Sequence, residues 1–282
     1  MNYRHAFHAG NFADVVKHAI LCRILVHLAK KPTPFRILDT HAGIGLYDLT
    51  GDAATRTGEW QGGIGRLWST RLSAPLESFL EPYLTSVRAL NPGGALRFYP
   101  GSPLLVASRL RRSDQALACE LHPEDSALLT ETLADKRNIR VYPHDGYTAL
   151  KSFLPFPERR GAVIIDPPFE ATDEFDRLAT GVLAGLERAA ALTYMIWYPL
   201  KDTRAVDRFH KRLVQSGTRK ILAVEMATAT PGAGPGLTAA GLVLINPPWP
   251  LADDLTTHMP ALARLMEVGP GAGSRVEWLA GE

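Results

Sequence analysis

The segment GAVIIDPPFE (161–170) combines side chains that suit chemistry at the amino group of a nucleobase. Asp166 follows a short apolar run, and the two prolines after it, Pro167 and Pro168, fix the backbone and remove two amide donors. Their carbonyl groups must therefore find partners elsewhere. A carboxylate and a carbonyl that accept both hydrogens of an exocyclic amine would aim its delocalised lone pair. Phe169 would hold the base by stacking, which is worth ~1–3 kcal/mol.

This chemistry requires no metal, because positioning and electrostatics can direct the amine at an electrophilic carbon. The chain holds a second segment of the same form, Asn246-Pro247-Pro248-Trp249. It follows a strand that we expect to run antiparallel, so it should lie away from the other acidic strand ends. We therefore expect Asp166, and not Asn246, to be the catalytic group. Without a ligand, either segment would be only a proline-stiffened loop.

The segment FRILDTHAGIG (35–45) has the features of a ligand-binding turn after a first parallel strand. Gly43 and Gly45 allow the backbone to come close to a ligand. A dinucleotide fingerprint would need a third glycine where the chain has Asp48, and Asp39 would also repel a pyrophosphate. These acids favour a cationic cofactor without phosphate, such as S-adenosylmethionine (AdoMet), whose ammonium group would bind near Asp39. The alternative is a turn that binds no ligand.

Acidic residues also end the next two predicted strands. Glu120 is placed where a carboxylate can bind both ribose hydroxyls of a nucleoside. It lies much further from the glycine loop than the usual ~20 residues, which an insertion between the two strands would explain. Asp145, followed by Gly146, could accept a hydrogen bond from an adenine amino group. Each acid alone could be a strand-end cap, but the repeated placement favours a single nucleoside site.

The N-terminal segment YRHAFHAGNFADVVKH (3–18) is rich in histidine. His5, His8 and His18 could ligate zinc, but no cysteine or acid completes a site at metal-ligand spacing, so we expect no metal. Without a ligand, His18 would be a buried helix histidine bonded to a carbonyl. Lys17 lies on a largely apolar helix, where burying its charge is costly unless an anion such as an RNA phosphate lies nearby.

Strands and helices alternate along most of the chain. Short, densely apolar runs are typical of strands buried on both faces, and the alternation predicts an α/β fold with βαβ units and a parallel sheet. Ligands bind such sheets at the carboxyl ends of the strands. The expected strands are 35–39, 115–121, 139–145, 161–166, 191–198, 219–227 and 241–246, and the expected helices are 11–29, 103–112, 123–136, 172–189, 202–216 and 253–267. Asn11 or Asp14 could cap the first helix, and Ser102 the second.

Two segments depart from this alternation. From 46 to 99 there is no strong strand, and a glycine-rich passage precedes a helix-like one, which predicts a small inserted helical subdomain. The linker ATATPGAGPGLTAA (227–240) is too short and too rich in glycine and proline for a crossover helix, so we expect an antiparallel C-terminal hairpin with a mobile loop. The predicted core is formed by 1–45 and 100–282, with the N-terminal motif and helix in 1–30.

The composition is that of a folded protein, since 46% of the 282 residues are hydrophobic and 21% are charged. Two cysteines, Cys22 and Cys119, exclude a disulfide framework and suit a reducing cytosol. No apolar run reaches ~18 residues and the N-terminus lacks the core of a signal peptide, so we expect a cytoplasmic protein without a membrane partner. The formal charge of +2 means that a nucleic acid would bind a local basic patch. The arginine clusters could equally be solvated helix faces.

Together these segments resemble the RlmJ (YhiR) family of 23S ribosomal RNA adenine-N6 methyltransferases, within the AdoMet-dependent amino-methyltransferases. The resemblance covers essentially the whole chain and rests, in order, on YRHAFHAGNFADVVKH, LDTHAGIG, YPGSP, ELHP, HDG, IDPPFE, WYP and INPPW. The N-terminal segment is highly specific to the family, whereas DPPF alone is not. Phe169 departs from the tyrosine that the family commonly has. Stacking survives this change, but a hydroxyl contact would be lost.

The resemblance implies a Rossmann-like methyltransferase fold with a small helical insertion, and methylation of one adenine of 23S rRNA that is naked or not yet fully assembled. It implies that AdoMet, and the product S-adenosylhomocysteine, contact His18, His41, Ser102, Glu120, Asp145, Gly146 and Asp166. It places Tyr3, His5 and Lys17 beside the target base or the reacting centre. These residues, together with Asp39 and Gly43 of the loop and Pro167 and Phe169 of the DPPF segment, form the expected site. No metal and no obligate protein partner is expected.

Other functions are compatible with the same residues. DNA-adenine and protein-glutamine methyltransferases use similar tetrapeptides, and a nucleic-acid-binding protein could keep the fold without turnover. Because duplex geometry hides the adenine amine, an RNA target is expected to be single-stranded, looped or flipped out. In this scheme 46–99 acts either as a mobile lid or as a fixed RNA-binding wall.

Overall fold

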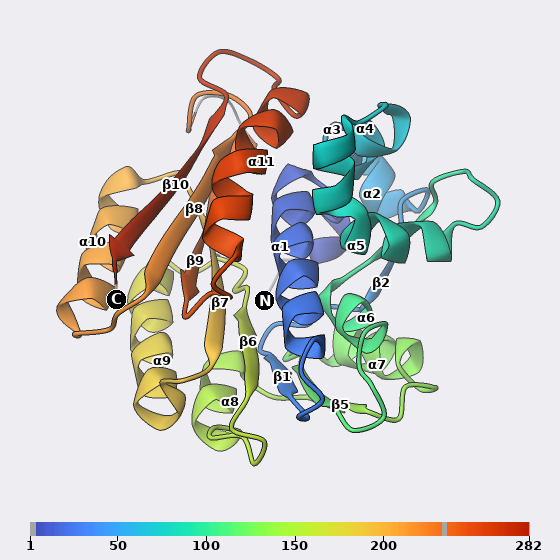
Figure 1. Ribbon diagram of the computed structural model, residues 1–282. Coiled ribbons are helices and arrows are strands. Elements are labelled where there is room, and N and C mark those ends of the chain that lie inside the picture. The colour runs from blue at the N-terminus through green and yellow to red at the C-terminus, as the bar shows by residue number, and fades with distance from the viewer. Residues whose placement is uncertain (1–3, 233–235, 282) are drawn as a thin grey trace.

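An eight-stranded sheet runs through the middle of the molecule, with helices on both faces (Figure 1). The computed structural model describes residues 4–232 and 236–281. The strand order is β10-β8-β9-β7-β6-β1-β4-β5. Neighbours from β5 to β7 run parallel, whereas β9, β8 and β10 each run antiparallel to the preceding strand of that series. This arrangement confirms the predicted α/β fold with a mostly parallel sheet and antiparallel C-terminal strands.

All seven predicted strands are present, although several are shorter than expected. They are β1 (Arg36–Asp39), β4 (Gln115–Cys119), β5 (Ile139–Tyr142), β6 (Gly161–Ile165), β7 (Thr193–Pro199), β8 (Ile221–Ala227) and β9 (Ala239–Ile245). An eighth strand, β10 (Gly273–Ala280), was not predicted. It forms one edge of the sheet and its residues are exposed or half-buried, so it lacks the dense apolar run that marks the inner strands.

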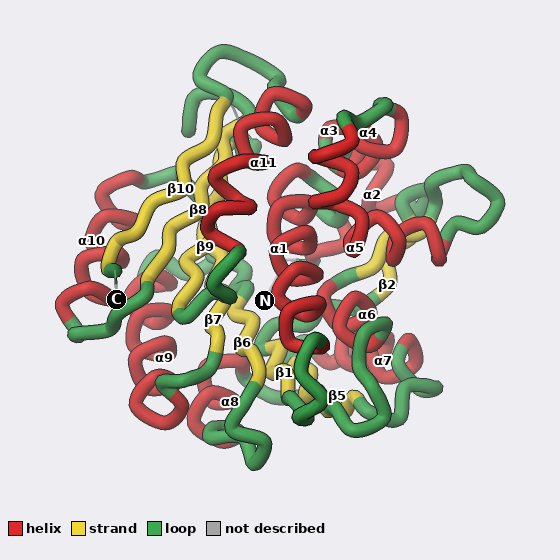
Figure 2. Tube along the Cα trace, viewed as in Figure 1, coloured by secondary structure: helices red, strands yellow, loops and turns green. Residues whose placement is uncertain are grey.

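Successive residues of the inner strands pack into two separate cores, one on each face of the sheet. Ile37 and Ile164 belong to the first core, and their neighbours Leu38 and Val163 belong to the second. Figure 2 shows the two helical layers. The first face is covered by α1 (Phe12–Ala29), α5 (Ala74–Leu90), α6 (Ser102–Ala107), α7 (Pro123–Thr132) and α11 (Leu251–Leu265), and the second by α8 (Gly146–Ser152), α9 (Glu174–Ala189) and α10 (Thr203–Gln215). Among the helices of the described ranges, none has the length and hydropathy needed to cross a membrane.

Several helix boundaries correct the sequence-based expectations. Of the two candidate caps of α1, the structure selects Asn11, whose side chain accepts the amide of Asp14 at 3.0 Å. Ser102 is the first residue of α6 rather than its cap, a position that Gly101 takes. The helix α7 ends at Thr132 instead of 136. The short helix α8 was not predicted, although its cap, Asp145, had been singled out for another reason.

The segment from 46 to 99 is helical, with a pair of short strands at its base. The strands β2 (Leu46–Asp48) and β3 (Phe98–Pro100) pair antiparallel, and α2 (Asp52–Thr57), α3 (Glu59–Gly62), α4 (Ile64–Ser69) and α5 lie between them. Leu80, Tyr83 and Val87 of α5 are fully buried in the same core as α1 and α11. This shared core favours a fixed wall over a mobile lid.

The predicted antiparallel hairpin is formed by β8 and β9. The tip of its predicted mobile loop, 233–235, lies outside the described residues. Because β9 runs antiparallel to β7, its last residue, Ile245, pairs with Tyr194 near the start of β7. The NPPW segment therefore lies at the opposite edge of the sheet from Asp166, as expected. There Asn246 donates to backbone carbonyls of the α9–β7 connection, and Trp249 is 85% exposed.

Candidate active site

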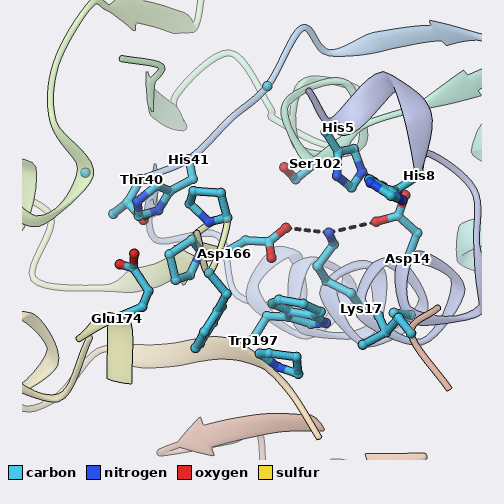
Figure 3. Close-up of a pocket in the computed structure, with 18 of the residues that line it drawn as sticks. His5, His8, Asp14, Lys17, Thr40, His41, Ser102, Asp166, Glu174 and Trp197 are labelled. Atoms are coloured by element: carbon cyan, nitrogen blue, oxygen red, sulfur yellow. Dashed lines mark hydrogen bonds and ion pairs between the residues drawn. The ribbon is translucent and has the colours of Figure 1, made fainter. Parts of the chain in front are cut away.

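A cavity of about 530 Å³ opens at the carboxyl edge of the sheet. It lies where the chain order reverses between β1 and β6, the position at which open α/β sheets bind ligands. Figure 3 shows side chains from α1, the loop after β1, α6 and the loop after β6 meeting there. The expected site residues on its wall are His5, Lys17, His18, His41, Gly43, Ser102, Glu120, Asp145, Gly146, Asp166, Pro167 and Phe169. Tyr3 lies outside the described residues.

The DPPF segment presents an acid and an aromatic ring at the tip of β6. Asp166 directly follows the strand, and its carboxylate points into the cavity (Figure 3). Phe169 has a φ of 51°, a left-handed conformation that is uncommon for an aromatic residue. Its ring makes edge contacts with Trp197 and Phe175, at centroid distances of 5.6 and 4.8 Å. The turn therefore brings a hydrogen-bond acceptor and an aromatic surface to the same end of the cavity.

Lys17 connects the N-terminal motif to the DPPF segment. Lys17 is only 4% exposed. Its ammonium nitrogen lies 2.7 Å from a carboxyl oxygen of Asp14 and also forms an ion pair with Asp166 (Figure 3). The sequence led us to expect an anion, such as an RNA phosphate, beside a buried Lys17. In the structure two carboxylates of the protein itself, Asp14 and Asp166, supply the opposite charge.

The charges in this group are stabilised by one another. Burial alone would lower the pKa of Lys17, but the carboxylates of Asp14 and Asp166 raise it above its usual value. Burial likewise opposes ionisation of Asp14, yet the nearby His5 and Lys17 hold its pKa well below the usual range. Lys17 is therefore a fixed cation at neutral pH rather than a base.

Glu120 and Asp145 lie on the other side of the cavity, after β4 and β5. The two oxygens of Glu120 accept the backbone amides of Gly43 and His122 at 2.9 and 2.8 Å. Each of these oxygens retains a second lone pair for a ligand hydroxyl. Asp145 caps α8 through Oδ1, which accepts from the amide and hydroxyl of Thr148 at 2.7 and 2.8 Å. Its second oxygen is the atom available to an amino group in the cavity.

Two glycines of this wall lie so close to neighbouring atoms that a side chain would not fit. A Cβ atom on Gly146 would lie 2.4 Å from the Thr40 carbonyl oxygen and 2.6 Å from the His41 ring. Gly43 has a φ of 64°, and a Cβ there would meet the Tyr47 hydroxyl at 2.4 Å. Burial lowers the pKa of His41 to about 4, so that its ring is neutral and hydrogen-bonds the Thr40 hydroxyl at 2.8 Å.

Asp39 occupies a different position from the one expected. It is 2% exposed and is not part of the cavity wall. Neither of its carboxyl oxygens makes a hydrogen bond of normal geometry among the described residues, although the Ser102 hydroxyl and the His41 backbone lie close enough to lower its pKa. Burial, together with the nearby charge of Asp166, raises the pKa of Asp39 to about 7. The residue therefore lies behind the cavity wall in this structure.

His18 and Ser102 close the floor of the cavity. His18 is 1% exposed, and its Nδ1 lies 2.8 Å from the hydroxyl of Tyr99. The partner is therefore a hydroxyl and not the carbonyl expected for a buried helix histidine. Tyr83 donates in turn to Tyr99 at 3.0 Å. Burial lowers the pKa of His18 to about 3, so the ring is neutral.

The remaining histidines of the N-terminal motif bind carboxylates. His5 lies 3.0 Å from Asp14, and His8 lies 2.9 Å from Glu59 of the 46–99 segment. Hydrogen bonding to Glu59 raises the pKa of His8. In the described parts of the chain, no group of three or more histidine, cysteine, aspartate or glutamate side chains has the arrangement of a metal site.

Three cavity residues with a clear role in its geometry were missed by the sequence analysis. Asp14 holds Lys17 and lies three residues before it on α1, a spacing that brings helix side chains together and could have revealed the pair. Trp197 follows Ile196 in the WYP motif and packs against Phe169. Glu174 is buried and accepts from the Tyr147 hydroxyl at 2.6 Å, and nothing in the local sequence indicates this contact.

The charge of the cavity suits a cation. Its wall includes eight carboxylate residues but only three lysine or arginine residues; the former are Asp14, Glu59, Glu120, Asp125, Asp145, Asp166, Glu174 and Asp202, and the latter are Lys17, Arg177 and Lys201. A pyrophosphate would be repelled here, whereas a ligand with sulfonium and ammonium groups would be attracted. The volume is also in the range of small-molecule sites. The described residues therefore fit AdoMet better than a dinucleotide.

Comparisons with known proteins agree with this geometry. Residues 32–280 match the family described as ribosomal RNA large subunit methyltransferase D, RlmJ. Over the full length of both chains, the sequence is 42% identical to ribosomal RNA large subunit methyltransferase J of Haemophilus influenzae and 40% identical to the protein of that name from Escherichia coli. A crystal structure from Legionella pneumophila has 30% sequence identity and a TM-score of 0.87, and the alignment covers 96% of this chain and 98% of that one.

Proposed function

This chain belongs to the RlmJ family of ribosomal RNA large subunit methyltransferases, and from this premise we propose that it transfers a methyl group from AdoMet to the N6 amine of an adenine in 23S rRNA. The fold is that of a Rossmann-like methyltransferase. The observation that carries the proposal is the carboxylate of Asp166 beside the Phe169 ring, at the carboxyl edge of the sheet and inside an acidic cavity. A ribosomal RNA substrate would place the reaction in the cytoplasm.

In this proposal the cavity binds AdoMet and the target base side by side. Glu120 would bind the ribose hydroxyls and Asp145 the adenine amine of AdoMet, with Gly43 and Gly146 permitting close approach of the backbone. His18, His41 and Ser102 would complete the cofactor contacts. Support comes from the shared position of these residues around one cavity. Asp39 would add a favourable charge for the cation without touching it.

The residues of the DPPF segment would prepare the nucleophile. AdoMet, when bound, supplies an electrophilic methyl group. Asp166 and the carbonyl of Pro167 would accept the two N6 hydrogens and aim the nitrogen lone pair, while Phe169 stacks on the base. After transfer, the extra proton on N6 would pass to Asp166 or to water. Lys17 and the N-terminal residues His5 and Tyr3 would lie beside the base.

The target adenine must leave its stack to enter the cavity. The N6 group is inaccessible inside a duplex, so a looped or flipped nucleotide of naked or incompletely assembled 23S rRNA is the proposed substrate. The acidic wall cannot hold the phosphate backbone, which would instead run over cationic residues outside the cavity.

The function is tested by offering the protein three substrates. Purified full-length protein is incubated with methyl-labelled AdoMet and naked 23S rRNA, 16S rRNA or genomic DNA, and the products are digested to nucleosides and identified by mass spectrometry. We expect label only in N6-methyladenosine from 23S rRNA, and none with the isosteric variant Asp166→Asn.

Other outcomes would replace the proposal with one of its alternatives. Label in N6-methyldeoxyadenosine would identify a DNA methyltransferase. Tight binding of AdoMet and RNA without any transfer would identify a binding protein that has lost turnover. Label at another atom of the base would refute the assigned role of the Asp166 carboxylate.

A further inference from the structure

Asp14 is the one carboxylate in the sequence of the N-terminal motif. It is 1% exposed and lies in the first turn of α1. Its Oδ2 accepts the backbone amide of Gly10 at 2.8 Å and lies 3.0 Å from Nε2 of His5, while its Oδ1 lies 2.7 Å from the ammonium nitrogen of Lys17. One buried acid thus joins the backbone of the motif to two of the residues assigned to the substrate side.

The same geometry exposes a conflict at Asp166. The carboxylate that should accept the amine hydrogens of the target base already binds Lys17 through Oδ2. A buried ammonium cannot simply be left without a counter-ion, because an unpaired charge in this position would cost several kcal/mol. Asp14 is a second counter-ion that is already in contact with Lys17, on the side away from Asp166 (Figure 3).

We propose that Asp14 is a positioning residue that keeps the ammonium of Lys17 in place when the Asp166 carboxylate turns to the amine of the substrate. The inference rests on the proposed function. Lys17 has three N–H donors, so its bond to Asp166 can lengthen while its bond to Asp14 persists. In this role Asp14 need not contact either ligand. Its effect is to hold the cation and so to release one oxygen of Asp166 for the base.

The surroundings of the pair make this division of roles specific. The titratable and charged groups that face Asp14 and Lys17 are His5, His8, His18, Asp39, Tyr83, Tyr99 and Asp166. Lys17 is the ammonium cation of this group. Burial keeps His18 neutral, whereas hydrogen bonding to Glu59 raises the pKa of His8. Removal of the Asp14 charge would leave Asp166 as the principal contact of Lys17. Lys17 would then bind the Asp166 carboxylate more tightly and withdraw that carboxylate from the substrate amine.

The experiment combines a double-mutant cycle with a pH profile. Asp14→Asn, Lys17→Met and the double variant are assayed in single-turnover methylation of 23S rRNA, with AdoMet binding and thermal unfolding measured on each. We expect Asp14→Asn to lower the rate by ~10–100-fold while AdoMet affinity and the KM for RNA change by less than ~3-fold. In the Lys17→Met background, the same substitution should change the rate by less than ~3-fold, because its effect passes through Lys17.

The pH profile separates this role from a structural one. Without Asp14, the pKa of Lys17 should fall. Loss of the Lys17 proton would then release Asp166, so the rate of Asp14→Asn should recover above about pH 9, where the wild-type rate stays level. Asp114→Asn is the matched control. Asp114 is also fully buried and also accepts a backbone amide, from Phe35, but it lies at the opposite edge of the sheet. Its variant should lose stability without a change in the pH profile.

The outcomes distinguish the inference from the proposed function. An additive cycle, or parallel pH profiles for Asp14→Asn and wild type, would overturn the role of Asp14 even if methylation is fully confirmed. Failure of the wild-type protein to methylate rRNA would instead remove the proposed function, and this inference with it. If Asp14→Asn does not fold, Asp14→Glu tests the same role with the charge kept. A rate and pH profile within ~3-fold of wild type would support the positioning role, and a rate lowered by ~10-fold or more together with an additive cycle against Lys17→Met would overturn it.

Discussion

Asp166 concentrates the proposed chemistry in one side chain. Among the described acids of the cavity wall, it is the one directly followed by two prolines at a strand end, and it is in contact with Lys17, 149 positions earlier in the chain. The second segment of similar form has an amide in place of the acid, and its Asn246 is used to bind backbone carbonyls. The same tetrapeptide pattern thus performs a structural task at one edge of the sheet and offers a charged acceptor at the other.

Substitution of Asp166 should separate binding from catalysis. In Asp166→Ala, AdoMet binding should stay within about tenfold of wild type, whereas methyl transfer should fall by ~10³-fold or more, because the amine loses its acceptor. Calorimetric titration and a single-turnover assay measure the two effects. Unchanged turnover in this variant would eliminate Asp166 as the group that positions the amine.

Asp39 should make cofactor binding depend on pH. Because its pKa is raised to about 7, Asp39 holds a proton below neutrality, and that proton must leave when a nearby cation favours the ionised form. AdoMet affinity should therefore increase by up to ~10-fold between pH 6 and pH 8. The isosteric variant Asp39→Asn should remove this dependence, as measured by titration calorimetry. Equal slopes in both proteins would contradict the effect of Asp39 on the cavity.

At the scale of elements, the N-terminal motif and the 46–99 segment are fitted together through their backbones. The amide of Ile64 donates to the carbonyl of Gly10 at 2.9 Å. A Cβ atom on Gly63 would lie 2.1 Å from the same carbonyl oxygen and 2.4 Å from the carbonyl carbon of Asn11. Gly10 donates its amide to the Asp14 carboxylate, and the Asn11 side chain accepts the Asp14 amide. The backbone contact with Gly63 and Ile64 is therefore connected to the active site through Asp14.

Two adjacent glycines provide a matched test of this contact. Gly63→Ala should displace the Gly10–Asn11 backbone, lower the free energy of unfolding by ~1–3 kcal/mol and reduce methyl transfer. Gly62→Ala faces open space, since no atom lies within 4 Å of the added Cβ, and should change stability by less than ~0.5 kcal/mol. Urea unfolding and the methylation assay compare the two. Equal behaviour of both variants would show that the contact is not needed.

At the scale of the whole molecule, we propose that 1–45 and 100–282 form the methyltransferase core and that 46–99 is an insertion that completes it. The proposal treats the insertion as a fixed wall because α5 is buried against α1 and α11. The overall charge of +2 is small, yet the cavity is acidic. The attraction for a cationic cofactor is therefore a local property that the total charge does not reveal.

The shared core predicts cooperative unfolding of the entire chain. Differential scanning calorimetry of the full-length protein should give a single transition, and a variant that replaces 49–96 with a short glycine linker should lose its cooperative transition, because α1 would expose the surface that α5 now buries. Two separated transitions, or a stable core without 49–96, would indicate an independent subdomain.

Much of the fold was accessible from the sequence because local signals and the global arrangement agree. The seven predicted strands carry dense apolar runs, which identified them. The strand β10 was missed because its residues are exposed or half-buried, so it carries no such run. The short helix α8 was missed because its seven residues carry little periodicity, although the cap at Asp145 marked its start.

The sequence by itself determined which acids would share an edge: parallel strands present their carboxyl ends together, so Glu120, Asp145 and Asp166 had to lie near one another once their strands were placed. Only the tertiary structure decided how far each acid would be from solvent and which cation would reach it. Asp39 was buried behind the wall, and Lys17 met Asp166 across 149 positions of the chain. Burial and long-range ion pairs arise from the packing of helices on the sheet, and neither follows from the spacing of residues along the chain.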